Sequence, residues 1–110
     1  MNTSAMIDAH FHCWQPARAD YGWLDASINP ALAAICRDVS VADWQAQCAP
    51  HGITGGVLVQ AAPTEAETRF LLGLADENPV VLGVVGWVDL LASDAADRIQ
   101  QLKKYPKLKG

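Results

Sequence analysis

Two short segments of this chain are apolar at almost every position. They are residues 56–60 (GVLVQ) and 80–89 (VVLGVVGWVD). Strands with apolar side chains on both faces are typical of parallel sheets whose two faces are both covered. A third strand-like segment, from Met6 to His12, precedes them. These three segments predict the parallel sheet of an α/β protein.

Helix signals lie between and after the strand segments. Residues that cap helix N-termini open three amphipathic stretches: Ser40, Thr64 and Ser93. Residues that stop helices follow those stretches: Gly52, Asn78–Pro79 and Tyr105–Pro106. Asp43 stands at the third position of the first helix, and Glu67 completes a capping box with Thr64. Residues 14–38 contain prolines and a glycine, so we expect them to be mainly loop.

The pattern amounts to about three βα units, after which residues 107–110 (KLKG) open a fourth strand. Connections of this kind build right-handed crossovers between parallel strands. Three strands alone would leave unpaired backbone at both sheet edges. We therefore interpret residues 1–110 as the N-terminal fragment of a single larger barrel domain. The alternatives are a complete small domain, or a homo-oligomer in which a second copy covers the open edge.

Two histidines lie close together at the end of the first strand segment. Side chains alternate between the faces of a strand, so Asp8, His10 and His12 are expected to point the same way. Two neutral imidazoles on one face can hold one metal ion or one substrate carbonyl. The plainer alternative is a pair of core histidines satisfied by hydrogen bonds. For Asp8 the alternative to a site role is a buried structural role.

Charge and cysteine content restrict the partners and the compartment. The net charge of −4 argues against nucleic acid or an anionic membrane as a partner. No apolar stretch approaches the ~20 residues that span a bilayer, and no signal peptide is recognisable. Three cysteines without a CxxC motif predict reduced thiols in a cytoplasmic protein. The basic run over 103–109 is interpreted as the solvated end of a helix.

An ordered set of strings along the whole chain resembles the sugar-lactone hydrolase branch of the amidohydrolase superfamily. That branch includes L-fuconolactonases, L-rhamnonolactonases and 2-pyrone-4,6-dicarboxylate lactonase. The strings are IDAHFHCW (7–14), DYGWL (20–24), RD (37–38), VLVQA (57–61), ETRFLL (67–72), GVVGWVDL (83–90) and YPKLKG (105–110). The resemblance implies a TIM-like (β/α)8 barrel with its active site at the C-terminal ends of the strands.

The resemblance also implies roles for the histidines. His10 and His12 would be catalytic, either by binding one divalent metal, for which zinc suits imidazole ligands, or by donating hydrogen bonds to the lactone carbonyl without a metal. The catalytic base of the family is an aspartate on the last barrel strand, to which no position here corresponds. The 110-residue chain alone is therefore expected to be inactive.

Three further residues at strand ends are candidates for binding the substrate: Trp14, Gln60 and Trp87. Asp89 could do the same, or instead orient the loop before the third helix. Arg37 and Asp38 are interpreted as an internal salt bridge. His51, at a helix C-terminus, is not expected to be a ligand, and Cys13 is expected to be a small buried thiol.

The resemblance thus predicts that the complete protein hydrolyses the lactone ring of a sugar acid in cytoplasmic sugar catabolism. One alternative is a pyrone-dicarboxylate lactonase or a metal-dependent decarboxylase of the same superfamily. The other is a truncated barrel without catalytic activity that binds a ligand or a partner. The expected partner is a small-molecule lactone.

Overall fold

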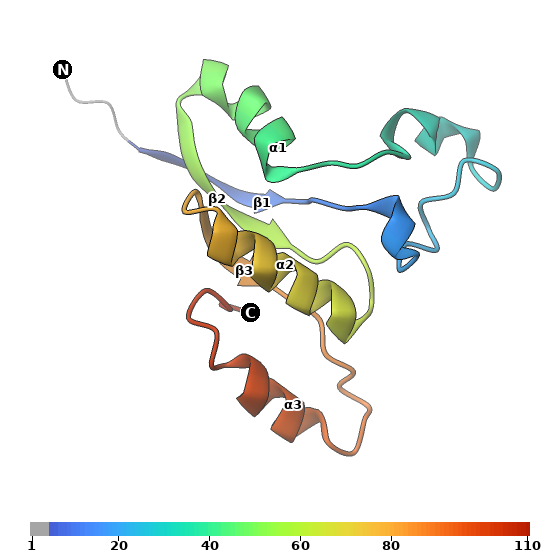
Figure 1. The fold of residues 1–110 in the computed structure, drawn as a ribbon, viewed down its shortest axis with the longest axis vertical. Coiled ribbons are helices and arrows are strands. Elements are labelled where there is room, and N and C mark those ends of the chain that lie inside the picture. Colours follow the sequence, from blue (N-terminus) through green and yellow to red (C-terminus); the bar gives the residue numbers. More distant parts are fainter. Residues whose placement is uncertain (1–4) are drawn as a thin grey trace.

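The computed structural model describes residues 5–110 and has a parallel three-stranded sheet of order β1-β2-β3 (Figure 1). The strands are β1 (Met6–Phe11), β2 (Ile53–Val59) and β3 (Val81–Val85). The α-helices are α1 (Val41–Cys48), α2 (Glu65–Glu77) and α3 (Ala95–Leu102). The predicted alternation of strands and helices is confirmed. Within the predicted loop 14–38 lie two 3-10 helices, Pro16–Arg18 and Pro30–Ile35, and a third, Ala49–His51, follows α1.

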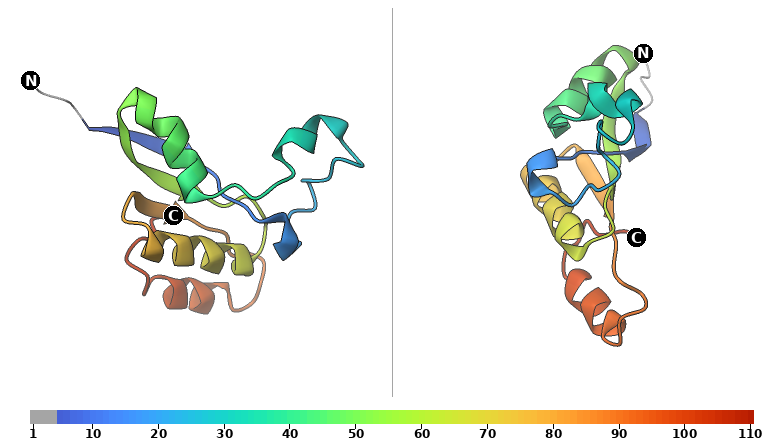
Figure 2. Two further views of the ribbon diagram at one scale, coloured as in Figure 1. Left: turned by 45° about the horizontal axis from the view of Figure 1, so that its top comes forward. Right: turned by 90° about the vertical axis from the view of Figure 1, so that its right-hand side faces the viewer.

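All three α-helices lie on one side of the sheet, as the edge-on view in Figure 2 shows. The core lies between them and the strands, where Leu58, Leu71 and Val84 are fully buried. Phe11 of β1 stacks on Trp44 of α1, with ring centroids 4.0 Å apart. The opposite face of the sheet is more open, and Ile7 on it is 45% exposed.

The strands differ from their predicted bounds for identifiable reasons. β2 begins at Ile53, three residues before the predicted start, and β3 ends at Val85 instead of continuing to residue 89. The buried Thr68 of α2 ends β3, because its hydroxyl accepts from the backbone N–H of Trp87 and donates to the Trp87 carbonyl, both at 2.7 Å. Gly86 permits this approach, since a Cβ there would lie 2.5 Å from the Thr68 methyl group.

The helix caps agree with prediction only in part. Ser40 and Asp43 form the reciprocal capping box of α1. Thr64 caps α2, because its hydroxyl accepts a hydrogen bond from the Glu67 N–H at 3.0 Å. The Glu67 carboxylate does not complete a capping box with the Thr64 N–H and instead accepts from the Ala61 N–H. The prediction that Ser93 caps α3 is wrong, because Asp94 holds the N-cap position and makes no side-chain capping bond.

Residues 107–110 add a fourth parallel segment beside β3, as predicted. The Val84 N–H donates to the Lys107 carbonyl at 2.7 Å, and the Lys109 N–H donates to the Val84 carbonyl at 2.9 Å. The Lys107 ammonium donates to the Ala75 carbonyl in the last turn of α2 at 2.7 Å. The interpretation of the basic run as a solvated helix end is therefore wrong for Lys107, which caps another helix. No helix in the described range has the length and apolar character to cross a bilayer.

Candidate active site

An irregularity in β1 decides which side chains reach the candidate site. Asp8 pairs with Gly56 and Phe11 pairs with Leu58, so β1 uses one more residue than β2 between these two pairs. An extra residue of this kind is a β-bulge, which changes the alternation of side chains along the strand.

The bulge places Asp8 away from the histidines. Its carboxylate accepts a hydrogen bond of 2.9 Å from the indole N–H of Trp44, on the helix side of the sheet, and one of 3.1 Å from the His10 backbone N–H. The expectation that Asp8 shares a face with His10 and His12 is therefore wrong, and the structural alternative describes its role. The sequence alone does not reveal the bulge, because apolar and polar residues alternate without interruption from residue 7 to residue 12.

The imidazoles of His10 and His12 converge at the C-terminal end of β1. Their Nε2 atoms lie 3.2 Å apart, and their rings meet edge to face at 76°. Nδ1 of His12 lies 2.9 Å from the carbonyl oxygen of Val59, the last residue of β2. A carbonyl oxygen only accepts, so Nδ1 of His12 carries the proton. The Nε2 atom of neutral His12 then presents its lone pair towards His10.

This geometry fits two of the ligand positions of a zinc site. Two nitrogens bound at ~2.0–2.1 Å to one tetrahedral zinc lie about 3.3 Å apart, close to the 3.2 Å between the two Nε2 atoms. The bond from His12 to Val59 is the kind of outer contact that fixes the tautomer of a metal ligand. Within residues 5–110 no group of three His, Cys, Asp or Glu side chains lies close enough to hold a metal.

Two tryptophans extend the row of rings beyond the histidines. Trp14 lies next to His12, with ring centroids 6.3 Å apart and planes inclined by 27°. Trp23 meets Trp14 edge to face, with centroids 5.3 Å apart at 83°. The structure thus brings the predicted candidate Trp14 to the histidine pair. It adds Trp23, which the sequence analysis did not single out although it stands in the DYGWL string.

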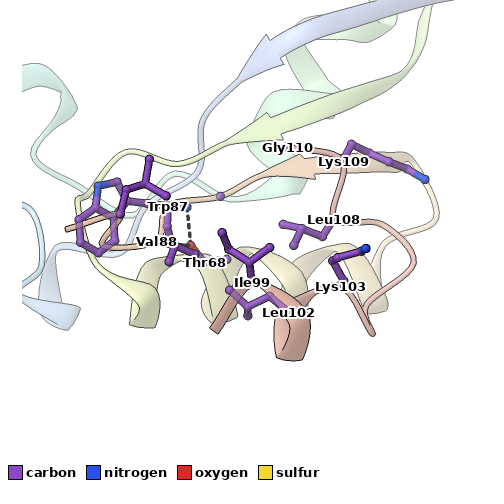
Figure 3. A pocket seen from close by; sticks show the side chains of 11 residues that line it. Thr68, Trp87, Val88, Ile99, Leu102, Lys103, Leu108, Lys109 and Gly110 are labelled. Atoms are coloured by element: carbon purple, nitrogen blue, oxygen red, sulfur yellow. Dashed lines mark hydrogen bonds between the residues drawn. The ribbon is translucent and has the colours of Figure 1, made fainter. Parts of the chain in front are cut away.

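The other strand-end candidates follow β2 and β3, the second and third strands in the sheet order. Gln60 directly follows the carbonyl that His12 contacts, and its backbone N–H donates to the Val85 carbonyl at 2.9 Å. Trp87 lines a cavity of about 550 Å³ between α3 and residues 108–110 (Figure 3), and neither histidine lines that cavity. The Asp89 carboxylate accepts from the Leu91 N–H at 3.0 Å and so orients the loop before α3, which was its alternative role.

The remaining sequence candidates take structural positions. Arg37 forms its ion pair with the Asp43 carboxylate at 3.7 Å and touches only the backbone carbonyl of Asp38, so the predicted Arg37–Asp38 salt bridge is wrong. His51 is exposed at the end of the 3-10 helix Ala49–His51. Cys13 is fully buried, as predicted.

Burial raises the pKa of the Cys13 thiol to about 12, and the nearby carboxylates of Asp43 and Glu67 add to that shift. Because the thiolate is the reactive form, Cys13 is expected to resist alkylation at about pH 8 in the folded protein. Cys36 is only partly buried and should react first. Peptide mapping after a timed exposure to iodoacetamide measures the extent of alkylation at Cys13 and at Cys36. Equal labelling of Cys13 and Cys36 in the native state would contradict this assignment.

A buried carboxylate, which the sequence predicted to cap a helix, connects loop 14–38 to the backbone that follows β2. Glu67 is fully buried. Its Oε1 atom accepts from the Tyr21 hydroxyl and from the Arg18 guanidinium, both at 2.8 Å. Its Oε2 atom accepts from the Ala61 N–H at 2.8 Å. Burial and the hydrogen bond to Glu67 raise the pKa of Tyr21 to about 12, so Tyr21 stays protonated and remains a donor at neutral pH.

The same network ties the loop 14–38 to the start of α2. Arg18 also pairs with Asp20 at 3.0 Å, and Asp20 accepts from the Thr64 hydroxyl at 2.8 Å. The Arg18 guanidinium lies 4.3 Å from the ring centroid of Phe70, in a cation–π contact. The loop that carries Trp23 is therefore tied to the N-terminal part of α2.

Comparison with known proteins agrees with this architecture. Residues 7–110 match the sequence model of the amidohydrolase family. The chain belongs to the amidohydrolase family. An L-fucono-1,5-lactonase of Burkholderia ambifaria is 40% identical to this amidohydrolase over 104 residues, which are 94% of the chain and 34% of the relative. An L-fucono-1,5-lactonase of Burkholderia multivorans is 33% identical over 94% of the chain and 33% of its own length.

Solved structures of amidohydrolases share the fold. A crystal structure of an amidohydrolase from Burkholderia multivorans with bound zinc superposes with a TM-score of 0.83 at 32% identity, over 97% of this chain and 36% of that one. Amidohydrolase 2 from Bifidobacterium longum subsp. infantis matches with a TM-score of 0.61 over 76% of this chain. This amidohydrolase chain spans about a third of the length of the curated lactonases that it matches.

Proposed function

We propose that this amidohydrolase chain is the N-terminal part of a (β/α)8 barrel enzyme that hydrolyses the lactone of a sugar acid. The observation that carries the proposal is the convergence of two imidazole Nε2 atoms, 3.2 Å apart, at the C-terminal end of β1. Active sites of such barrels lie at that end of the strands. The L-fucono-1,5-lactonases among its relatives support the choice of a sugar lactone.

The tautomer of His12 favours a metal over direct hydrogen bonding to the substrate. With Nδ1–H directed at Val59, the Nε2 atom of neutral His12 can accept a proton or bind a metal, but it cannot donate to a carbonyl. His10 and His12 would each supply one Nε2 ligand, and further ligands would come from the rest of the barrel. A zinc ion held there supplies Lewis-acid polarisation of the lactone carbonyl or an acidified water.

The neighbouring residues would position the substrate and the histidines. Val59 holds the ring of His12 in place through its carbonyl. Trp14 offers a ring face beside His12 for the substrate. The base that activates water and the acid that protonates the leaving alkoxide would come from the remaining part of the protein. Three free thiols, of which Cys13 and Cys48 are buried, fit a reducing, cytoplasmic setting.

Activity of the complete protein tests this proposal. We expect it to hydrolyse five- and six-membered sugar lactones, measured by acid release with a pH indicator, and residues 1–110 alone to be inactive. Incubation with a chelator should abolish hydrolysis, and added Zn²⁺ should restore it. Hydrolysis that is insensitive to the chelator would exclude the metal role of the histidines. Absence of hydrolysis on every sugar lactone, with a pyrone dicarboxylate as comparison substrate, would overturn the proposed function.

A further inference from the structure

Trp14 and Trp23 form an L-shaped surface that we call the aromatic corner. Their ring planes are inclined by 83°, with centroids 5.3 Å apart. Each indole N–H is fixed on a backbone carbonyl: Trp14 donates to Ile35 at 3.1 Å and Trp23 donates to Ala61 at 2.6 Å. Trp23 nevertheless leaves 44% of its surface exposed. The polar edges of both rings are thus occupied, while apolar ring surface of Trp23 stays free.

The aromatic corner lies directly beside the reacting end of the site. Trp14 follows His12 by two residues and lies 6.3 Å from it between ring centroids. Trp23 is anchored on Ala61, the second residue after β2, whose last carbonyl contacts His12. The corner therefore connects the C-terminal ends of β1 and β2. A ring bound against the Trp14 side of the corner would lie beside His12.

Glu67 is connected to Trp23 through a single residue, Ala61, by the two peptide groups on either side of its Cα atom. Its Oε2 atom accepts from the N–H of Ala61, and the carbonyl of Ala61 accepts from the Trp23 indole. Its Oε1 atom accepts from Arg18 and Tyr21, which stand on the same loop as Trp23. A fully buried carboxylate thus holds both the anchor of Trp23 and the loop that carries it.

We propose that Trp23 contacts the substrate, that the aromatic corner binds the C–H surface of a sugar-lactone ring, and that Glu67 is the positioning residue for Trp23. This inference rests on the proposed function and adds the residues that bind the ring of its substrate. The faces of aromatic rings carry negative charge density, which attracts C–H groups polarised by neighbouring oxygens. A saturated ring presents such groups in two directions and can touch both walls, whereas a flat pyrone can stack on only one.

The test uses the complete protein with Trp23→Ala, Trp23→Phe and Tyr105→Ala. Tyr105 is the matched control, because it is 43% exposed, close to the 44% of Trp23, and lies in the turn after α3. The measurements are KM and kcat for a sugar lactone and the Kd of the corresponding non-hydrolysable lactam by calorimetry. Trp23→Ala should raise KM and Kd about tenfold with little change in kcat. Trp23→Phe should have a smaller effect because it keeps a ring face.

The outcomes separate this inference from the proposed function. Unchanged lactam binding by Trp23→Ala, or an equal loss in Tyr105→Ala, would overturn the role of Trp23. A wild-type protein that binds the lactam but hydrolyses no lactone would overturn the proposed function and leave the aromatic corner standing. If the wild-type protein hydrolyses lactones and Trp23→Ala has the same KM, the binding role of the aromatic corner is refuted and the proposed function stands.

The positioning role of Glu67 is tested with Glu67→Gln, alone and combined with Trp23→Ala. The amide keeps the size of the side chain but offers N–H groups where Ala61 or Arg18 needs an acceptor. Glu67→Gln should raise KM more than it lowers kcat and should weaken the far-ultraviolet exciton signal of the two indoles. If Glu67 acts through Trp23, the double variant should have no higher KM than Trp23→Ala alone. Additive losses in KM would refute the positioning role.

Discussion

Replacing Glu67 by alanine is expected to lower the free energy of unfolding of the complete protein by about 3–5 kcal/mol, since it breaks a buried ion pair on one side. Arg18, whose side chain is only 19% exposed, would lose its 2.8 Å partner. The Tyr21 hydroxyl and the Ala61 N–H would lose their acceptor as well. Urea unfolding followed by circular dichroism measures the loss as a lower midpoint at unchanged slope.

Glu65 provides the matched control for this stability prediction, two residues away on the same helix. Its carboxylate pairs with Arg69 at 3.3 Å and with Arg98 at 3.6 Å, and its side chain is 26% exposed. Exposed pairs of this kind contribute about 0–1 kcal/mol, so Glu65→Ala should leave the midpoint nearly unchanged. Equal midpoints for the two alanine variants would show that the Glu67 network does not hold the loop.

If the proposed function is correct, replacing His10 or His12 by alanine is expected to lower kcat/KM of the complete protein by about 10²–10³-fold or more, because each substitution would remove a group that stabilises charge on the reacting carbonyl. In the proposed zinc site, the His12 variant should also release zinc more readily, since it would remove both one proposed ligand and the contact to Val59. The measurements are kcat/KM on a sugar lactone and the zinc content by mass spectrometry after gel filtration.

His51 is the control for the histidine variants, because it is the one other histidine of the chain and is exposed far from the pair. His51→Ala should retain wild-type kcat/KM and zinc content. If His10→Ala and His12→Ala retained kcat/KM within about threefold of wild type, the pair would be structural and the active site would lie elsewhere. If His10→Ala and His12→Ala lose activity but keep their full zinc content, the histidines act on the substrate carbonyl and not as zinc ligands.

Much of the fold follows from local sequence rules. The two nearly apolar segments located β2 and β3 correctly, because the strands of a parallel sheet are rich in apolar residues. Ser40 with Asp43 gave a true capping box, since every partner in it lies within four residues. The assignment of residues 107–110 to a fourth strand also holds, although Lys107 reaches across to α2 in a way that its neighbours in sequence do not reveal.

The errors arise where distant residues compete for the same group. Glu67 stands at the correct spacing to cap α2, but Arg18 and Tyr21, more than forty residues earlier, supply stronger donors for its carboxylate. Asp8 stands at the correct spacing to join the histidines, but the Trp44 indole on α1 binds it on the other side. In the candidate site, sequence spacing placed His10, His12 and Trp14 together, and the loop that brings Trp23 to them has no periodic pattern to predict it.

The bulge in β1 separates residues that pack against α1 from residues of the candidate active site, two roles that a regular strand would place on one face for Asp8 and the histidines. Asp8 and Phe11 serve the packing of α1, while the rings of His10 and His12 contact each other at the C-terminal end of the strand. Substitutions on the histidine side can therefore accumulate without repacking the helix layer behind them. For a protein engineer this makes the end of β1 a place to graft new ligands or new substrate contacts, provided that Asp8, Phe11 and Trp44 are left unchanged.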